Sequence, residues 1–171
     1  MEKKIRFIAI LDPEKGNGLR YGAVASRMLF DLNNELLGYQ NQFNAAQGIA
    51  LIDVPTEPEE GSTVHLRASW DKSRYALYRL TLMLLDGEPV GVLMNTRHPK
   101  SKYVSFWNFY VKPEFRGKGY GTQLMEYTME QHRALGFKEM GLTVHTYNPR
   151  AEAFYRRYGF AANTKEMFVA L

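Results

Sequence analysis

The residues with the clearest chemical meaning form a glycine-rich, basic segment in the second half of the chain. Residues 111–122 read Val-Lys-Pro-Glu-Phe-Arg-Gly-Lys-Gly-Tyr-Gly-Thr, so three glycines alternate with larger residues, and Arg116 and Lys118 stand among them. Glycine permits positive φ and lets a ligand come close to the backbone. Successive N–H groups at a helix N-terminus, where the dipole favours negative charge, would then bind a phosphate.

Two familiar phosphate-binding motifs do not fit the spacing of this segment. The P-loop requires Gly-Lys-Ser/Thr, but Lys118 is followed by Gly119. The dinucleotide fingerprint requires Gly-x-Gly-x-x-Gly, and here the third glycine, Gly121, comes one residue early. The segment therefore indicates phosphate binding of another kind.

A second block of chemically useful residues lies nearer the C-terminus. Residues 148–160 read Asn-Pro-Arg-Ala-Glu-Ala-Phe-Tyr-Arg-Arg-Tyr-Gly-Phe. Asn148 stands where a helix N-cap belongs, with Pro149 at the first helical position. The phenol of Tyr155 has an ordinary pKa of about 10, so it keeps a proton at neutral pH that it can donate. Its helical spacing from other apolar residues also fits core packing, and both interpretations stay open.

Together the two blocks resemble the signature of the GNAT superfamily of acyl-CoA-dependent N-acyltransferases (N-acetyltransferases). Arg116, Gly119 and Gly121 match its pattern of Arg or Gln, two residues, Gly, one residue, and Gly or Ala. Residues 111–115 match the usual lead-in, Val-x-Pro-x-Phe. Residues 148–160 look like the family's Asn-x-x-Ala-x-x-x-Tyr-x-x-x-Gly-Phe. The N-terminal part of the chain carries no such signature.

The resemblance implies acetyl-CoA as co-substrate and a set of residues that bind it. Backbone groups of Phe109 and Val111 would pair with the pantetheine arm, and one of their N–H groups would polarise the acyl carbonyl. Asn148 would hydrogen-bond a pantetheine amide, cap its helix, or do both. The full set implied to bind the cofactor is Phe109, Tyr110, Val111, Arg116, Gly117, Lys118, Gly119, Tyr120, Gly121, Thr122, Asn148 and Tyr155.

The resemblance also assigns a role to Tyr155 in acyl transfer from a thioester to an amine. Such a reaction must deprotonate the amine, stabilise charge on the carbonyl oxygen, and stabilise or protonate the departing thiolate. Tyr155 resembles the family's general acid for that thiolate.

The general base is where the sequence departs from a common family pattern. Many relatives carry Glu or Asp two to four residues before the strand's final valine, whereas this chain has Trp107, Asn108 and Phe109 there. His145 is the best titratable substitute, because an imidazole pKa of about 6.5 suits a base at neutral pH. We expect it at the end of a strand, facing the cofactor cleft. His65, the acidic loop at residues 53–61 and a water relay without a dedicated base remain alternatives.

Hydrophobic periodicity predicts the elements that position these residues. Strands are expected at residues 5–11, 78–85, 90–95, 103–111, 140–146 and 165–171. Helices are expected at 119–135 and 149–158, and an N-terminal amphipathic stripe predicts a helix that Gly38 divides into two pieces. The order predicts an α/β (α+β) fold with a mixed central sheet of about six to seven strands and about four flanking helices. The resemblance implies a splay between the strand ending near Val111 and the strand at 140–146.

Composition sets the broad class. A chain of 171 residues suits a single domain, with residues 1–75 on the acceptor side and 76–171 as the acyl-CoA-binding core. With 45% hydrophobic and 23% charged residues it reads as a soluble globular protein. Cysteine is absent, so disulfides and thiolate metal sites are excluded, and no metal is expected. No apolar stretch reaches the length of a membrane span, and we expect a cytoplasmic protein.

The net charge of +4 favours anionic partners. Acidic residues are interspersed with the basic ones, so we expect coenzyme A and an amine acceptor as partners rather than nucleic acid or a membrane. A homodimer is left open. The acceptor, a small molecule or a peptide, is not identified by the sequence, and a catalytically silent acyl-CoA-binding sensor is the alternative function.

Overall fold

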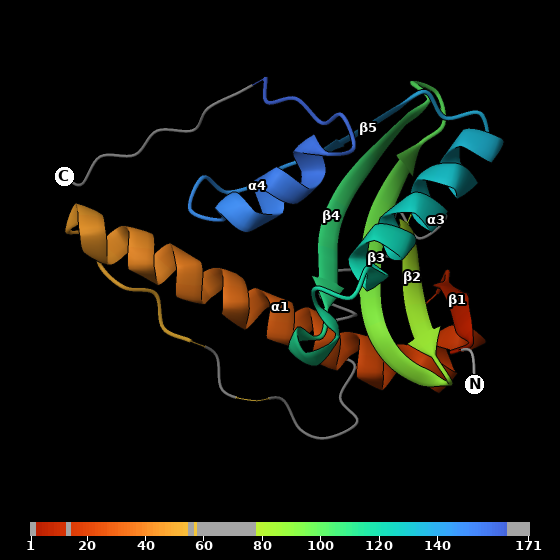
Figure 1. Cartoon of the computed structure of the whole chain (residues 1–171), viewed down its shortest axis with the longest axis horizontal. Coiled ribbons are helices and arrows are strands. Elements are labelled where there is room, and N and C mark those ends of the chain that lie inside the picture. The colour runs from red at the N-terminus through yellow and green to blue at the C-terminus, as the bar shows by residue number, and fades with distance from the viewer. Residues whose placement is uncertain (1–2, 13–14, 55–56, 58–77, 164–171) are drawn as a thin grey trace. The chain divides into compact units, whose positions relative to one another are not determined.

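The computed structural model describes residues 3–12, 15–54, 57 and 78–163. The strands are β1 (Ile5–Ile10), β2 (Tyr78–Leu85), β3 (Glu88–His98), β4 (Tyr103–Val111) and β5 (Glu139–Leu142), and the helices are α1 (Asn17–Gln47), α3 (Tyr120–Ala134) and α4 (Pro149–Arg156), with a 3-10 turn η2 (Pro113–Phe115) (Figure 1). The chain forms two compact units, each described here by itself. Unit 1 is Met1–Leu32 with Glu57–Leu142, and unit 2 is Asn33–Thr56 with Thr143–Leu171.

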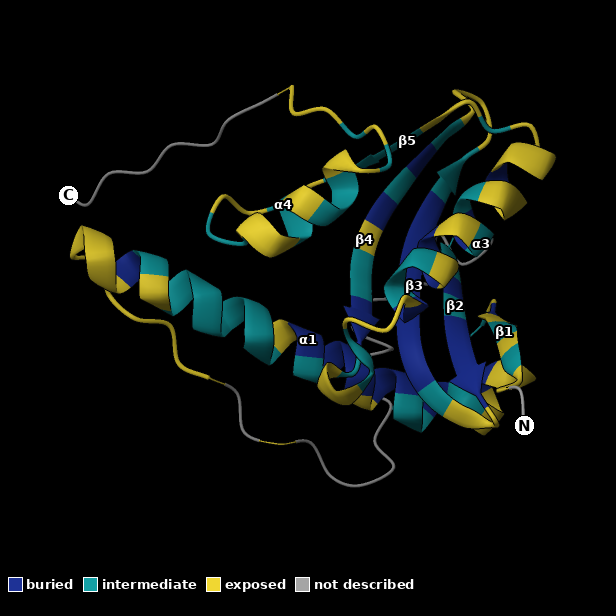
Figure 2. Ribbon diagram, viewed as in Figure 1, coloured by how far each residue is buried: buried dark blue, intermediate teal, exposed yellow. Residues whose placement is uncertain are grey.

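Unit 1 is built on one five-stranded sheet in the order β1-β2-β3-β4-β5. The first four strands pair antiparallel, and β5 pairs parallel to β4. A two-residue turn joins β2 to β3, with Asp86 at φ 51° and Gly87 at φ 93°, and two such positive angles match the right-handed twist of a hairpin. Figure 2 shows that β2 and β3 carry the most continuous burial, which makes them the centre of the core.

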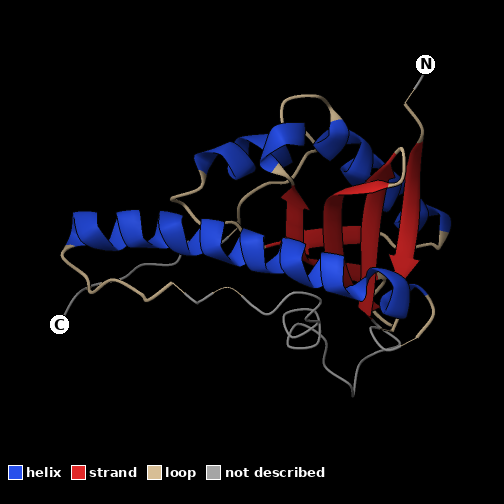
Figure 3. Ribbon diagram, turned by 90° about the horizontal axis from the view of Figure 1, so that it is seen from below, coloured by secondary structure: helices blue, strands red, loops and turns tan. Residues whose placement is uncertain are grey.

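Helices cover both faces of this sheet. The part of α1 that lies in unit 1 and helix α3 run on opposite faces (Figure 3). Helix α1 buries Ala25 and Met28 completely or nearly so, and α3 does the same with Leu124 and Met125. Apolar residues three and four apart share one helix face, so each helix presents one apolar stripe to the sheet. The elements that carry the glycine-rich segment are thus anchored by buried side chains.

Most of the expected elements are present, and the sheet is mixed as predicted, but several predictions were wrong. The described residues contain five strands and three α-helices, fewer than the six to seven strands and about four helices expected. The strand expected at 140–146 is β5, which ends at Leu142. Helix α1 continues through Gly38 because glycine costs only about 1 kcal/mol relative to alanine and keeps its N–H group.

Other predictions stand untested. The strand expected at 165–171 lies outside the described residues, and the single-domain assignment with its division at residue 75 remains a prediction. Within the described part of the chain, no helix combines the length and the apolar character that crossing a bilayer requires.

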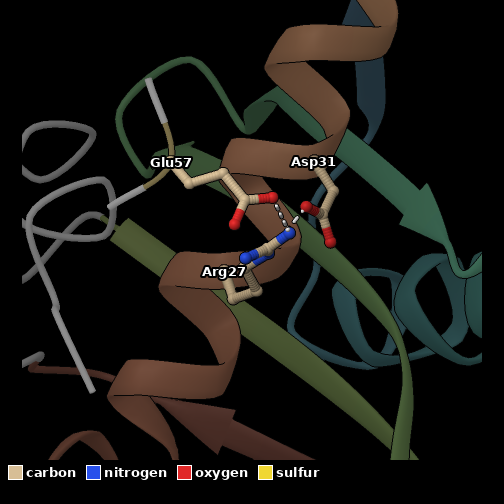
Figure 4. A network of polar contacts seen from close by, with 3 residues as sticks. All are labelled: Arg27, Asp31 and Glu57. Atoms are coloured by element: carbon tan, nitrogen blue, oxygen red, sulfur yellow. Dashed lines mark hydrogen bonds and ion pairs between the residues drawn. The ribbon is translucent and has the colours of Figure 1, made fainter. Parts of the chain in front are cut away.

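A polar network links α1 to the acidic segment that follows it (Figure 4). The guanidinium of Arg27 donates to the carboxylate of Asp31 at 2.8 Å and to that of Glu57 at 3.1 Å. These two bonds raise the pKa of Arg27, and the bond to Glu57 has the larger effect. The network is exposed, so it contributes little to stability. The carboxylate of Glu57 is bonded to Arg27, so it is less available to a cationic substrate than a free carboxylate would be.

A buried histidine ties α3 to the sheet. His132 is 4% exposed, its Nδ1 lies 2.7 Å from the carbonyl oxygen of Thr128, and Arg97 of β3 donates from Nε to its Nε2 at 3.2 Å. An imidazole that accepts at Nε2 and donates at Nδ1 is neutral. Burial, and to a lesser degree the charges of Arg97 and Arg79, lower the pKa of His132.

This lowered pKa predicts a loss of stability in mild acid. A histidine whose pKa is lower in the folded state stabilises the fold above its unfolded pKa of about 6.5, and that contribution is lost as the pH falls through the folded pKa. Urea unfolding of His132→Gln should therefore show a smaller fall in unfolding free energy from about pH 7.5 to about pH 5 than the wild type shows. At neutral pH the variant should be less stable by about 1–3 kcal/mol, because it disturbs a buried hydrogen bond.

The matched control is His145→Gln, which changes an exposed histidine. It makes the same change of side chain and leaves the hydrogen bonds of His132 to Thr128 and Arg97 intact. An equal dependence in the wild type and in His132→Gln would contradict the assignment.

Candidate functional site

The edge of β4 is released from its parallel neighbour partway along the strand. The β4–β5 ladder comprises four pairs, from Tyr103–Glu139 to Phe106–Leu142. Strand β4 continues to Val111, while β5 ends at Leu142. On its other side β4 stays paired with β3 as far as the Gly91–Val111 pair. The sheet thus loses its fifth strand where β4 approaches the glycine-rich loop. The splay of the two strands that the sequence led us to expect there stays a prediction.

A β-bulge lies at the point where the ladder ends. Met94 of β3 pairs with Asn108, but the next residue, Asn95, pairs with Phe106, so Trp107 is an extra residue in β4. A bulge of this kind bends the strand and redirects its side chains. The release of β4 and its bend therefore coincide.

The glycine-rich loop (residues 111–122) runs from the end of β4 through η2 into α3 (Figure 1). Gly117 and Gly119 have φ angles of 74° and 82°, which non-glycine residues seldom adopt. A Cβ atom at either position would meet nothing within 4 Å, so these angles, and not crowding within the chain, call for glycine. Gly119 is the N-cap of α3, with no side-chain cap bond and no acidic residue in the first turn.

An uncapped helix start of this kind presents backbone N–H groups and the positive end of the helix dipole. Because Gly117 and Gly119 have no side chains, the space beside the N-terminus of α3 stays open. The geometry suits an anion such as a phosphate.

Two cations hold the loop in shape while adding positive charge. Arg116 donates from Nε to the carbonyl oxygen of Val111 at 2.7 Å and lies 5.3 Å from the ring centre of Tyr110. Lys118 donates to the carbonyl oxygen of Glu114 at 2.7 Å. Both side chains are thus bonded to the segment's own backbone. Their charges remain beside the uncapped end of α3.

All of the expected cofactor-binding residues from Phe109 to Thr122 lie in unit 1, whereas His145, Asn148 and Tyr155 lie in unit 2. Asn148 is the N-cap of α4, and its Oδ1 accepts from the N–H of Ala151 at 3.1 Å. The capping interpretation is confirmed. Contact of Asn148 with a pantetheine amide stays a prediction.

Tyr155 lies on α4 among other aromatic rings. It is partly buried, with Phe154 and Phe160 in edge contact at 5.5 Å and 6.0 Å between ring centres. Burial raises the pKa of Tyr155 to about 12, because a phenolate is poorly solvated there. The phenol therefore stays protonated throughout the physiological range, as a proton donor must.

His145 does not lie where the sequence placed it. Strand β5 ends at Leu142, so His145 falls in the loop that leads to α4, not at the end of a strand. Its exposed ring stacks on Tyr147 with 4.8 Å between ring centres. Its role as a base stays a prediction, and His65 lies outside the described residues.

Sequence reasoning overlooked Tyr147, which joins the loop before α4 to α1 within unit 2. Its hydroxyl donates to Oε1 of Gln40 in α1, and its ring lies 5.7 Å from that of Phe43. A single aromatic residue in a loop gives no periodic signal, so only its contacts identify it. Within the described residues, no three His, Asp or Glu side chains gather as a metal site would need.

Solved structures share this arrangement of strands and helices. The aminoglycoside acetyltransferase meta-AAC0020, from an uncultured soil metagenomic sample and in complex with sisomicin, matches with TM-score 0.54 and 15% identity over 99% of this chain and 96% of its own. The aminoglycoside N-acetyltransferase AAC(6')-Iy in complex with CoA matches with TM-score 0.58 and 13% identity over 100% and 97%. A transcriptional regulator from Bacillus halodurans matches with TM-score 0.62 and 20% identity over 99% and 100%.

These likenesses show that the fold is that of the acetyltransferases. The sequence profile of the acetyltransferase (GNAT) family matches residues 46–160. The chain therefore belongs to the GNAT family, as the two sequence blocks indicated. No curated protein matches the chain's sequence.

Proposed function

We propose that the protein is an acetyl-CoA-dependent N-acetyltransferase that acylates a primary amine of a small molecule or a peptide. One observation carries the proposal: the β4–β5 ladder ends at Phe106–Leu142, and β4 then leads through η2 into an uncapped, glycine-lined helix start. A released strand edge can pair with an extended amide chain, and the helix start can bind phosphates. Coenzyme A has both parts in that order.

The cofactor-binding roles follow from this arrangement. The backbone of Phe109 and Val111, beyond the last β4–β5 pair, would pair with the pantetheine amides. The backbone of Gly117 to Thr122 at the start of α3 would bind the pyrophosphate, with the charges of Arg116 and Lys118 close by. Tyr110 and Tyr120 are buried, and their rings contact Arg116 and Phe115 of the loop.

The proposed reaction is a direct attack. The neutral amine nitrogen bonds to the thioester carbonyl carbon, a backbone N–H of β4 stabilises the negative charge on the oxygen, and the C–S bond then breaks. Tyr155 gives its proton to the departing thiolate and regains one from solvent. The proton lost by the amine passes to His145 or to water.

We place the reaction in the cytoplasm, because the absence of cysteine fits a reducing compartment. We also propose a single domain in which residues 1–75 contribute the acceptor side. Aminoglycosides are among the acceptors worth testing, since two structurally similar proteins are aminoglycoside acetyltransferases.

The proposal is tested in two stages. Acetyl-CoA and free coenzyme A should each raise the melting temperature, since a ligand that binds only the native state stabilises it by mass action. Release of free thiol is then followed with a panel of amines, including aminoglycosides, polyamines and peptides. No thermal shift with millimolar ligand would refute the proposal, whereas a shift without turnover on any amine would favour the sensor alternative.

The loop can be tested with one substitution and a matched control. Gly119→Val places a β-branched residue at φ 82°, where the pyrophosphate should approach the backbone. Gly136→Val makes the same change at φ 78° just beyond the other end of α3, again with nothing within 4 Å of the new Cβ. Both should lose at least about 1–2 kcal/mol of stability through backbone strain.

Only Gly119→Val should weaken acetyl-CoA binding, at least about tenfold, as measured by calorimetry on the folded variants. Equal affinities in the two variants would remove the loop from the cofactor site.

Tyr155→Phe separates proton donation from packing, because it removes one hydroxyl and keeps the ring. Turnover should fall about 10- to 100-fold while acetyl-CoA affinity stays close to that of the wild type, since the proton is needed only in the transition state. The defect should shrink with a more acidic thiol leaving group. Tyr158→Phe, one turn along the same chain segment, is the control and should keep its turnover. Wild-type turnover in Tyr155→Phe when chemistry limits the rate would leave Tyr155 as a packing residue.

A further inference from the structure

Within the part of the chain that the structure describes, Trp107 is the one aromatic residue among the exposed large hydrophobic side chains. It is 63% exposed, although its neighbour Phe106 is only 5% exposed. Its indole Nε1 donates to Oγ1 of Thr96 at 2.8 Å, and Thr96 is itself 3% exposed. A hydrogen bond to a buried partner fixes the ring in place. The protein thus keeps a large aromatic side chain outside, in one orientation.

The direction of this ring follows from the alternation of β3. Arg97 reaches His132 of α3, so it points to the α3 face of the sheet. Successive residues of a strand point to opposite faces. Thr96 therefore points away from α3, and Trp107, which is bonded to it, lies over the face that does not carry α3.

Trp107 also lies close to the place where the proposed chemistry occurs. It is the first residue of β4 after the last β4–β5 pair, and it is the bulged residue. Phe109, whose backbone is proposed to pair with the cofactor, lies two residues further on, about 7 Å along the strand. A group bound on the indole would be within reach of an acyl group held at that edge.

The chemistry of the ring points to a cation. Among aromatic side chains, tryptophan attracts cations most strongly, and its exposed face has room for one. Elsewhere in unit 1, arginine or lysine lies over the rings of Tyr21, Phe30, Tyr110, Phe115 and Phe137. In the part of the chain that the structure describes, no arginine or lysine lies over Trp107. Among the rings that the structure describes, the indole of Trp107 is thus available to a cation from outside the chain.

We infer that Trp107 is a specificity-determining residue of the acceptor site, and that its indole face binds a second ammonium group of a di- or polycationic amine. This inference rests on the proposed function and adds the class of acceptor. The amine that reacts must be neutral, whereas a second amine of the same molecule stays protonated at neutral pH and can lie over the indole. A monoamine has no such second group.

Kinetics test the inference with spermidine and butylamine as acceptors. Trp107→Leu should raise KM for spermidine about 5- to 30-fold, the range of a partly desolvated cation–π contact, and change KM for butylamine less than about threefold. Trp107→Phe keeps an aromatic face and should lie between the wild type and Trp107→Leu. Thr96→Val keeps the indole but removes its hydrogen bond, and should raise KM for spermidine by a smaller factor than Trp107→Leu.

Fluorescence provides a readout that needs no turnover. The chain has two tryptophans, so Trp70→Phe leaves Trp107 as the only indole reporter. Spermidine should change its emission in a saturable way, and butylamine at equal ionic strength should not. This titration also keeps the inference testable if Trp107→Leu fails to fold.

The outcomes separate the inference from the proposed function. Saturable binding of spermidine at Trp107 without any acetyl transfer would support the cation site and refute the enzymatic proposal. Acetyl transfer to spermidine with an unchanged KM in Trp107→Leu, or no change in Trp107 emission on titration, would overturn the inference while leaving the enzyme intact.

Discussion

The parallel ladder between β4 and β5 stops at the Phe106–Leu142 pair, and the candidate site depends on that ending. Backbone N–H and C=O groups inside a sheet are normally satisfied by the next strand. Beyond the last β4–β5 pair, β4 runs on to Val111 and is still anchored by β3. A strand held on one edge is rigid enough to position a ligand and retains an edge with which the ligand can pair.

The bulge at Trp107, where the β4–β5 ladder ends, also changes which side chains of β4 face the core. Trp107 is an extra residue in β4, so the alternation of side chains shifts there. The residues before and after it pair with β3 in registers that differ by one residue. Phe106 stays in the core, and Trp107 is turned out to solvent. One irregularity thus separates the structural part of β4 from the part that carries the proposed chemistry. Functional side chains are often redirected by bulges in this way.

Hydrogen bonds within the glycine-rich loop order its two cationic side chains. Arg116 and Lys118 are bonded to backbone carbonyl oxygens of their own segment, at Val111 and Glu114. If the loop binds the pyrophosphate as proposed, this order would lower the entropy cost of binding. At the other end of the helix, His132 stays neutral between Thr128 and Arg97, so α3 is anchored to β3 by hydrogen bonds as well as by apolar packing.

The sequence determined the features that depend on a few adjacent residues. It predicted the helix at 119–135, the cap at Asn148 and the two strands on either side of residues 86–89, because caps and turns are set by local backbone preferences. The two motif blocks identified the family for the same reason, since their spacing is visible in the chain itself.

Only the tertiary structure decided where strands stop pairing and which side chains face outward. Periodicity extended β5 to residue 146 and put His145 at its end, but pairing with β4 stops at Leu142 and leaves His145 in a loop. Local sequence also could not predict that α1 continues through Gly38 or that Trp107 is exposed. Register, bulges and burial are set by partners far away in the sequence, and local preferences carry no information about those partners.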